Sequence, residues 1–123
     1  MTLSADQLVA EARSRIVEIA PHAAAGETAC VLIDVREPAE FVSGHLPGAV
    51  NIPRGVLEFQ VGSHPALEDP QQPVVVYCRS GGRAALAALA LSDLGFGNVR
   101  SIAGGIMGWA DADLPVHVPE PAQ

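Results

Sequence analysis

Hydrophobic and polar residues follow one another along the chain in blocks that are typical of an α/β domain. Candidate strands occupy residues 29–35, 49–52, 74–77 and 99–103, and those at 29–35 and 74–77 are nearly continuous apolar runs. Such runs are typical of parallel strands that are covered on both faces of a sheet. Between these segments, apolar residues recur at helical spacing, most clearly in the Ala/Leu-rich segment 84–94. The alternation predicts a three-layer α/β fold, with a mostly parallel sheet of four to five strands flanked by helices.

The N-terminal segment has the pattern of a helix. Ser4 and Gln7 have the spacing of a capping box. Apolar residues then recur at helical spacing until Pro21, namely Leu8, Ala12, Ile16 and Ile19. Residues 22–28 are expected to form a loop. We therefore assign residues 1–28 to a helix and loop that are part of the domain or appended to it.

The central segments combine short elements with turn signals. A short helix is expected over residues 38–43, with Gly44 as its stop, and Pro47-Gly48 suits a type II turn. Within residues 54–73, Leu57, Phe59 and Val61 predict only a short packed piece. The α/β domain is placed at residues 29–116. The proline-rich residues 117–123 are expected to form a flexible tail.

Composition narrows the class of protein. The 123-residue chain is 49% hydrophobic, yet no apolar run approaches the ~20 residues that a membrane span needs. Charged residues within the first helical pattern argue against a signal peptide, so a soluble, cytoplasmic protein is expected. The net charge is −7, and the seven basic residues are all arginines without a basic stripe. We therefore expect neither a nucleic-acid nor a membrane partner.

The candidate chemistry lies where the apolar run 74–77 ends at Cys78. The carboxyl edge of a parallel sheet is where open α/β folds bind ligands, and the helix that follows begins with N–H groups that have no partner in the helix. A thiol at this place should ionise more readily than an ordinary cysteine. Arg79 and Arg83 flank the short glycine-containing loop. The pattern predicts a nucleophilic cysteine beside a binding site for a small anion.

The second cysteine, Cys30, has a different position. Cys30 begins an apolar run, whereas Cys78 ends one. In neighbouring parallel strands the two residues would lie roughly 13–17 Å apart at ~3.3 Å per residue. A disulfide needs Cα atoms within about 7 Å. We predict a small buried hydrophobe at Cys30 and a free thiol at Cys78. Two cysteines are also too few for a zinc cluster, so no metal is expected.

Four blocks of this sequence resemble the signature motifs of single-domain rhodanese-type sulfurtransferases. They are residues 34–41 (DVREPAEF), 44–53 (GHLPGAVNIP) and 78–83 (CRSGGR), and a closing block with Gly104-Gly105, Trp109 and Leu114-Pro115. The resemblance covers roughly residues 29–116 in the right order. It implies a five-stranded, mostly parallel sheet and a persulfide-forming cysteine. The fifth strand could come from residues near Met1 or from residues 116–118.

The resemblance implies that Cys78 takes sulfane sulfur from thiosulfate or a persulfide and passes it to cyanide, a thiol or a partner protein, without a cofactor. The binding loop would surround the persulfide with main-chain N–H groups; it consists of Arg79, Ser80, Gly81, Gly82 and Arg83. One loop arginine is expected to orient the donor while the other pairs with an acidic neighbour.

Three departures from the family pattern bear on the donor. Glu40 and Ser80 stand where some thiosulfate-using relatives carry basic residues, which favours a persulfide as the donor in the cell. Ala84 stands where several relatives have a serine, so one possible hydrogen bond to the sulfur is absent.

Two other functions remain open. The first is a cysteine phosphatase or arsenate reductase. Cysteine phosphatases separate their cysteine and arginine by five residues, whereas four residues separate Cys78 from Arg83. The shorter loop fits a single sulfur better. The second is a rhodanese-like carrier or protein-binding module with little turnover.

Four more polar residues are candidates for supporting roles, each with a structural alternative. Asp34 and Arg36 end a strand and could face the site or form a structural ion pair. His45 could act as an acid or base or brace a turn. Arg54 could line the rim of the site or be a solvated surface residue. Trp109 is expected in the core.

Overall fold

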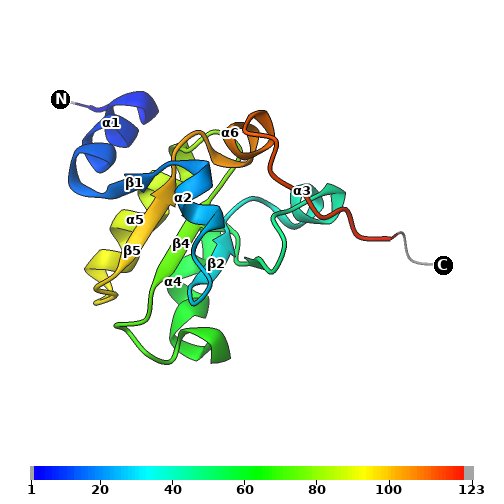
Figure 1. Cartoon of the computed structure of the whole chain (residues 1–123). Coiled ribbons are helices and arrows are strands. Elements are labelled where there is room, and N and C mark those ends of the chain that lie inside the picture. Colours follow the sequence, from blue (N-terminus) through cyan, green and yellow to red (C-terminus); the bar gives the residue numbers. More distant parts are fainter. Residues whose placement is uncertain (1, 121–123) are drawn as a thin grey trace.

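The fold is an α/β sandwich around one parallel sheet, seen in a computed structural model that describes residues 2–120. The five strands have the order β1-β5-β4-β2-β3, and every neighbouring pair is parallel (Figure 1). They are β1 (Val17–Ile19), β2 (Val31–Asp34), β3 (Val50–Asn51), β4 (Val74–Tyr77) and β5 (Val99–Ile102). The predicted parallel α/β architecture is confirmed.

Helices cover both faces of the sheet. Helices α1 (Ala5–Arg15), α4 (Leu57–Gln60) and α5 (Gly82–Asp93) lie on one face, and α2 (Pro21–Ala25) and α6 (Gly105–Asp111) lie on the other (Figure 1). Helix α3 (Pro38–Ser43) follows β2, as predicted. Three 3₁₀ helices complete the segment before β4; they are η1 (Arg54–Val56), η2 (Val61–Ser63) and η3 (Pro65–Leu67).

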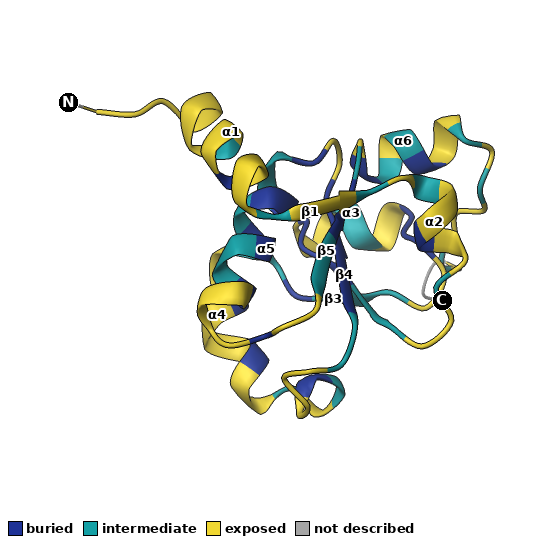
Figure 2. Ribbon diagram, turned by 60° about the vertical axis from the view of Figure 1, so that its left-hand side comes forward, coloured by how far each residue is buried: buried dark blue, intermediate teal, exposed yellow. Residues whose placement is uncertain are grey.

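The central strand β4 divides the core into two clusters. Successive side chains of a strand point to opposite faces. Val74 and Val76 therefore pack with α5, whereas Val75 and Tyr77 pack with α2 and α6. All four residues are buried, and β4 is the dark blue strand at the centre of Figure 2. Cys78 continues the alternation and belongs to the cluster on the α5 face.

The N-terminal segment differs from the helix and loop that were expected. Helix α1 has the predicted Ser4 capping box but ends at Arg15. Residues 17–19 form β1, which pairs with β5. Ile16 packs on the α5 face and Ile19 on the α2/α6 face, so their helix-like spacing came from two different faces. The fifth strand is thus neither near Met1 nor at residues 116–118.

Residues 21–25 form α2, although residues 22–28 were expected to form a loop. Pro21 begins this helix, a position that the fixed φ of proline favours, and Ala24 is buried against the sheet. In the segment before β4, Leu57 and Val61 are buried, but Phe59 is 86% exposed. A residue two positions from a buried one lies on the opposite side of a helix, which explains the exposed Phe59.

Turns and termini complete the fold. Gly48 has φ +80°, and the N–H of Ala49 bonds the carbonyl of Leu46, as expected for the predicted turn. His117 exchanges two backbone hydrogen bonds with His45, of 2.8 and 2.7 Å. Residues 121–123 of the expected tail lie outside the described residues. None of the helices within residues 2–120 has the length and apolar character that crossing a membrane requires.

Candidate active site

Cys78 directly follows β4, at the carboxyl edge of the sheet. The buried run of β4 fixes its backbone, and α5 begins four residues later at Gly82. Gly81 has φ +119°, a conformation that residues with a Cβ rarely adopt. The chain therefore turns from strand into helix within four residues, 78–81, and the loop closes over the cysteine.

The Cys78 thiol lies inside this loop. Its Sγ accepts hydrogen bonds from the backbone N–H of Gly81 at 3.1 Å and from that of Ala84 at 3.4 Å. Only 2% of the residue is exposed, because the loop surrounds the sulfur. Two N–H groups and the N-terminus of the 12-residue helix α5 thus face one atom. This arrangement stabilises negative charge on sulfur.

The backbone of Cys78 is held from the other side by α6. Its carbonyl accepts the N–H of Ile106 at 2.9 Å, and the carbonyl of Arg79 accepts the N–H of Met107 at 3.1 Å. A Cβ on Gly105 would clash with the carbonyl oxygens of both Cys78 and Arg79. Only glycine lets α6 approach so closely, and this contact fixes the start of the loop.

The two loop arginines have different surroundings. Arg83 forms a bidentate ion pair with Glu40 of α3, with N–O distances of 2.7 and 3.1 Å. The hydrogen bonds from Arg83 lower the pKa of Glu40 to about 2, and Glu40 in turn raises the pKa of Arg83. Arg79 and Ser80 are exposed at the mouth of the loop. Arg83 is therefore the loop arginine with the acidic partner.

Asp34 and Arg36 form a buried ion pair. Asp34 is fully buried and Arg36 is 6% exposed. Arg36 Nη2 lies 2.7 Å from Asp34 Oδ2 and donates to the carbonyl of Gly44 at 2.6 Å. The Tyr77 hydroxyl donates to Asp34 Oδ2 at 2.7 Å and accepts the N–H of Leu46 at 3.0 Å. The network therefore connects residues 34–36, residues 44–46 and Tyr77 by hydrogen bonds.

This network lies on the other face of the sheet from the thiol. Tyr77 belongs to the cluster on the α2/α6 face and Cys78 to that on the α5 face. Burial and the bond to Asp34 raise the pKa of Tyr77, so it stays protonated and can donate. Within residues 2–120, no hydrogen bond joins the network to Cys78. Its geometry is that of a brace for the carboxyl ends of β2 and β4.

His45 and Arg54 also have structural partners. The His45 ring stacks on Phe41 at 3.7 Å, and its Nδ1 lies 3.0 Å from the Phe41 carbonyl oxygen. Arg54 pairs with Glu58 at 2.8 Å, one helical turn away. Neither side chain has a described contact with Cys78. The catalytic roles considered for them remain predictions.

Sequence reasoning missed the partners that organise the site. Glu40 and Arg83 lie far apart in the chain, so no local sequence pattern indicated that they pair. The Tyr77 hydroxyl gave a weak signal, because a tyrosine within a buried strand needs a hydrogen-bond partner. Cys30 is a free, half-buried thiol, and Cys78 is free as well. Cys30 is less buried than expected.

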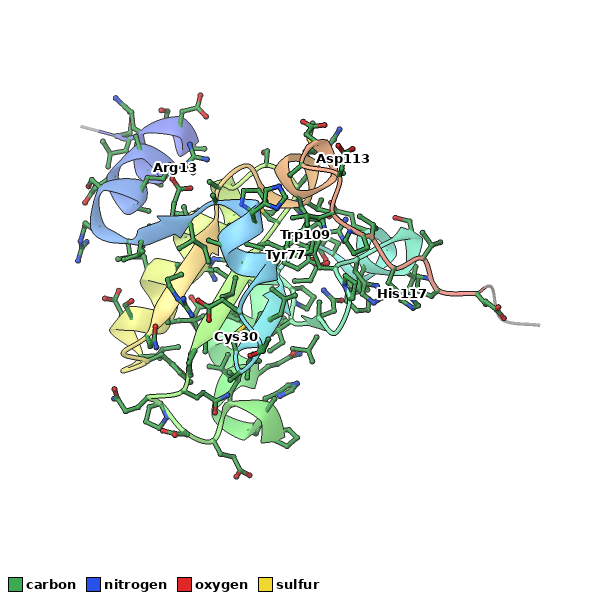
Figure 3. All side chains as sticks on the ribbon, in the orientation of Figure 1. Arg13, Cys30, Tyr77, Trp109, Asp113 and His117 are labelled. Atoms are coloured by element: carbon green, nitrogen blue, oxygen red, sulfur yellow. The ribbon has the colours of Figure 1, made fainter. Side chains whose placement is uncertain are left out.

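Cys30 lines a cavity of about 510 Å³. The cavity lies by α2 and α6, and Leu32, Pro47 and Trp109 form part of its wall. Figure 3 shows Cys30 and Trp109 on this side of the domain. Trp109 is buried, as predicted. Cys78 is not among the lining residues, so the cavity is separate from the loop. In the part of the chain that the structure describes, no three His, Cys, Asp or Glu side chains gather as metal ligands would.

Comparison with known proteins assigns the family. The profile of the rhodanese-like domain matches residues 20–112. The chain belongs to the rhodanese-like domain family. A sulfurtransferase of Allochromatium vinosum is 38% identical over 90 residues, which cover 73% of this chain and 80% of that protein. The chloroplastic thiosulfate sulfurtransferase 16 of Arabidopsis thaliana is 41% identical over 95 residues, covering 68% and 76%.

A solved structure extends the similarity of this rhodanese-like domain to nearly its whole length. RPA3614 of Rhodopseudomonas palustris, a protein of unknown function described as a possible tyrosine phosphatase, has a TM-score of 0.85 at 30% identity. The match covers 95% of this chain and 96% of the other. The rhodanese resemblance of the motifs is confirmed. Helix α1 and β1 lie before the segment that the family profile matches.

Proposed function

We propose that this rhodanese-like domain is a sulfurtransferase that carries sulfane sulfur on Cys78. The observation that supports this most directly is the position of Sγ, which accepts two main-chain N–H groups inside a closed loop. The family and the sulfurtransferase relatives support the same reaction class. A donor would approach Sγ from the side where the loop residues Arg79 and Ser80 are exposed.

The first half-reaction loads the cysteine. The Cys78 thiolate attacks the outer sulfur of the donor, forming a new S–S bond while the donor's own S–S bond breaks. With thiosulfate, sulfite leaves with the bonding electron pair. With a persulfide, a thiolate leaves. The product is a Cys78 persulfide whose terminal sulfur carries the charge or a proton. This is covalent catalysis by an activated nucleophile.

The second half-reaction transfers the terminal sulfur from the Cys78 persulfide to an acceptor. A nucleophile such as cyanide or a thiolate attacks the terminal sulfur, and the Cys78 thiolate leaves with the electron pair. Thiocyanate or a new persulfide is released, and the enzyme returns to its starting state. The N–H groups of the loop stabilise the anionic sulfur before and after each transfer. The reaction needs no metal or organic cofactor.

The charges around the loop favour a persulfide over thiosulfate as the donor. Thiosulfate is a dianion, and Arg83 is neutralised by Glu40. Because the pKa of Glu40 is lowered to about 2, this carboxylate stays ionised at physiological pH. Arg79 is the remaining loop cation. A donor of low charge, either a small persulfide or a persulfide on a partner protein, loses less solvation in such a site.

Phosphatase chemistry is the second candidate, because a structural neighbour of this chain is described as a possible tyrosine phosphatase. The loop supports it less well. Only four residues separate Cys78 from Arg83. The Arg83 guanidinium, which would have to bind a phosphoryl group, is already hydrogen-bonded to Glu40. A pure carrier or docking module is the third candidate, and the complete Cys78 loop argues against an inert module.

Intact-mass analysis tests the proposal. Wild-type protein incubated with thiosulfate or with glutathione persulfide should gain one sulfur atom, which cyanide removes as thiocyanate. Cys78→Ser should gain none, and Cys30→Ser should behave as wild type. The absence of added mass on wild type with either donor would contradict the proposal. Hydrolysis of an aryl phosphate that depends on Cys78 would favour the phosphatase instead.

A further inference from the structure

We propose that Arg13 of α1 is a positioning residue for the Cys78 loop, although it lies before the segment that matches the family profile. For sulfur transfer this inference rests on the proposed function. For the reactivity of the thiol it does not, because the ionisation of Cys78 can be measured without any sulfur donor. The proposal rests on the contact of Arg13 with Gly81, on its anchor at Glu18, and on the way α1 covers the loop.

The first observation is the contact with Gly81. This residue donates its N–H to Cys78 Sγ and has no side chain on its outer face. A Cβ built on Gly81 would lie 2.9 Å from Arg13 Nη2 and 3.9 Å from Arg13 Cζ. The guanidinium therefore rests directly against the loop residue that faces the sulfur. Figure 3 shows Arg13 on α1, away from Cys30 and Trp109.

The second observation is that Glu18 anchors this guanidinium. Arg13 Nε lies 3.6 Å from Glu18 Oε2, and the same carboxylate oxygen lies 4.0 Å from the position of a Cβ on Gly81. Arg13 lies in the last turn of α1 and Glu18 lies in β1, which is hydrogen-bonded to β5. The edge strand thus holds the arginine over the loop.

The third observation concerns the surface that α1 covers. Val9 Cγ2 lies 3.7 Å from the position of a Cβ on Gly82, and Ala12 is only 1% exposed. Helix α1 thus covers the outer side of both loop glycines, whereas Gly81 directs its N–H to the sulfur on the inner side. The loop is held between α1 outside and the sulfur inside.

Two physical effects follow from this arrangement. The guanidinium and α1 restrict rotation of the flexible Gly81 backbone, which keeps its N–H aimed at Sγ. The positive charge also favours the anionic sulfur over the neutral thiol. Arg13 is 43% exposed, so solvent and Glu18 reduce the electrostatic effect. We expect a change of about three-fold in the fraction of reactive thiolate near neutral pH.

The test is the pH dependence of alkylation, measured on the full chain in a Cys30→Ala background. Iodoacetamide then reports on Cys78 alone. Arg13→Ala should move the midpoint of the alkylation profile to higher pH by about half a unit and should lower the rate of sulfur uptake at pH 7. Arg13→Lys, which keeps the charge, should return the midpoint toward that of the parent. Arg15→Ala is the matched control, because Arg15 lies in the same helical turn and is exposed.

The possible outcomes separate a positioning role from a stabilising one. A lower unfolding temperature with an unchanged alkylation profile for Arg13→Ala would overturn the proposal. An equal shift in Arg15→Ala would overturn it too, because any charge on α1 would then suffice. If wild type takes up no sulfur but Arg13→Ala still shifts the profile, the proposed function fails and the role of Arg13 stands.

Discussion

The two cysteines of this domain lie at opposite edges of the same sheet, and their surroundings differ accordingly. Cys78 follows β4, and its sulfur accepts two backbone N–H groups. Cys30 precedes β2, which pairs in parallel with β4 from Val31 opposite Val74. Burial, followed by the charge of Glu27, raises the pKa of the Cys30 thiol. One sheet thus holds one thiol that faces backbone N–H donors and one whose pKa is raised by burial.

Chain direction explains the difference. At the carboxyl edge of a parallel strand the chain turns into a helix, and the first N–H groups of that helix face the turn. At the amino edge of β2 there is a loop, and the Glu27 carboxylate, which is paired with Arg100, raises the pKa of Cys30 more than Arg100 lowers it. Residue type alone therefore says little about a cysteine, whereas its place relative to strand direction says much.

The largest expected effect is the contrast in alkylation. Native protein treated with iodoacetamide at pH 7 should be modified at Cys78 about ten-fold or more faster than at Cys30, because thiolate reacts and thiol does not. Peptide mapping over a time course measures both rates in one sample. Faster modification of Cys30 would reverse the comparison, and an unmodified native Cys78 would show that small molecules do not reach the loop.

Gly81→Ala should remove much of the difference in alkylation rate between Cys78 and Cys30. The φ of +119° disfavours a Cβ, and the new methyl group would meet Arg13 Nη2 at 2.9 Å. We expect a loss of about 1–2 kcal/mol in unfolding free energy and about ten-fold slower alkylation of Cys78. Urea denaturation and the alkylation time course measure these. Gly82→Ala is the control for stability, since its Cβ would make only an ordinary contact of 3.7 Å with Val9.

Glu40→Gln should increase the difference between the two edges of the sheet, because it adds net positive charge at the edge that carries Cys78. Arg83 loses its carboxylate partner, so its charge becomes available to an anionic donor. We expect kcat/KM for thiosulfate to rise several-fold, with a stronger dependence on salt, and that for a low-charge persulfide to change little. Glu58→Gln is the matched control, because it releases Arg54 instead. Equal increases in both variants would show that general charge, and not Arg83, is responsible.

A smaller effect should appear in the unfolding free energy of the domain at acid pH. The pKa of Glu40 is lowered from 4.5 to about 2 by the hydrogen bonds from Arg83. A carboxyl with a lowered pKa in the folded state contributes stability that is complete above its unfolded pKa and lost as pH falls toward the folded value. Between pH 5 and 2, the unfolding free energy of Glu40→Gln should therefore fall less steeply than that of wild type. Identical slopes in urea titrations would contradict this.

Much of the site could be predicted because its signals are local. Val74 to Arg83 contain the buried strand, the nucleophile, the glycines of the turn and the start of the helix within ten residues. The strand, the turn and the helix were each recognisable from neighbouring residues alone. The likeness of four motif blocks then identified the family, and the profile match confirmed it.

The parts that were wrong or missed depend on tertiary structure. Residues 17–19 have apolar spacing that fits a helix, and only pairing with β5 makes them a strand. The structural alternative for Asp34 and Arg36 could be stated from the sequence, but their partner Tyr77 could not. Arg83 and Glu40 meet across the fold, as do Arg13 and Gly81, and no sequence spacing reports such contacts.

The close approach of α6 to the nucleophile has a consequence for variation in this domain. At position 105 any side chain, however small, would press on the carbonyl oxygens of Cys78 and Arg79. A saturation library selected for turnover should therefore be as intolerant at residue 105 as at the cysteine itself. The neighbouring Met107, half exposed, should accept many substitutions, so the map of tolerated changes would alternate sharply within a single helical turn.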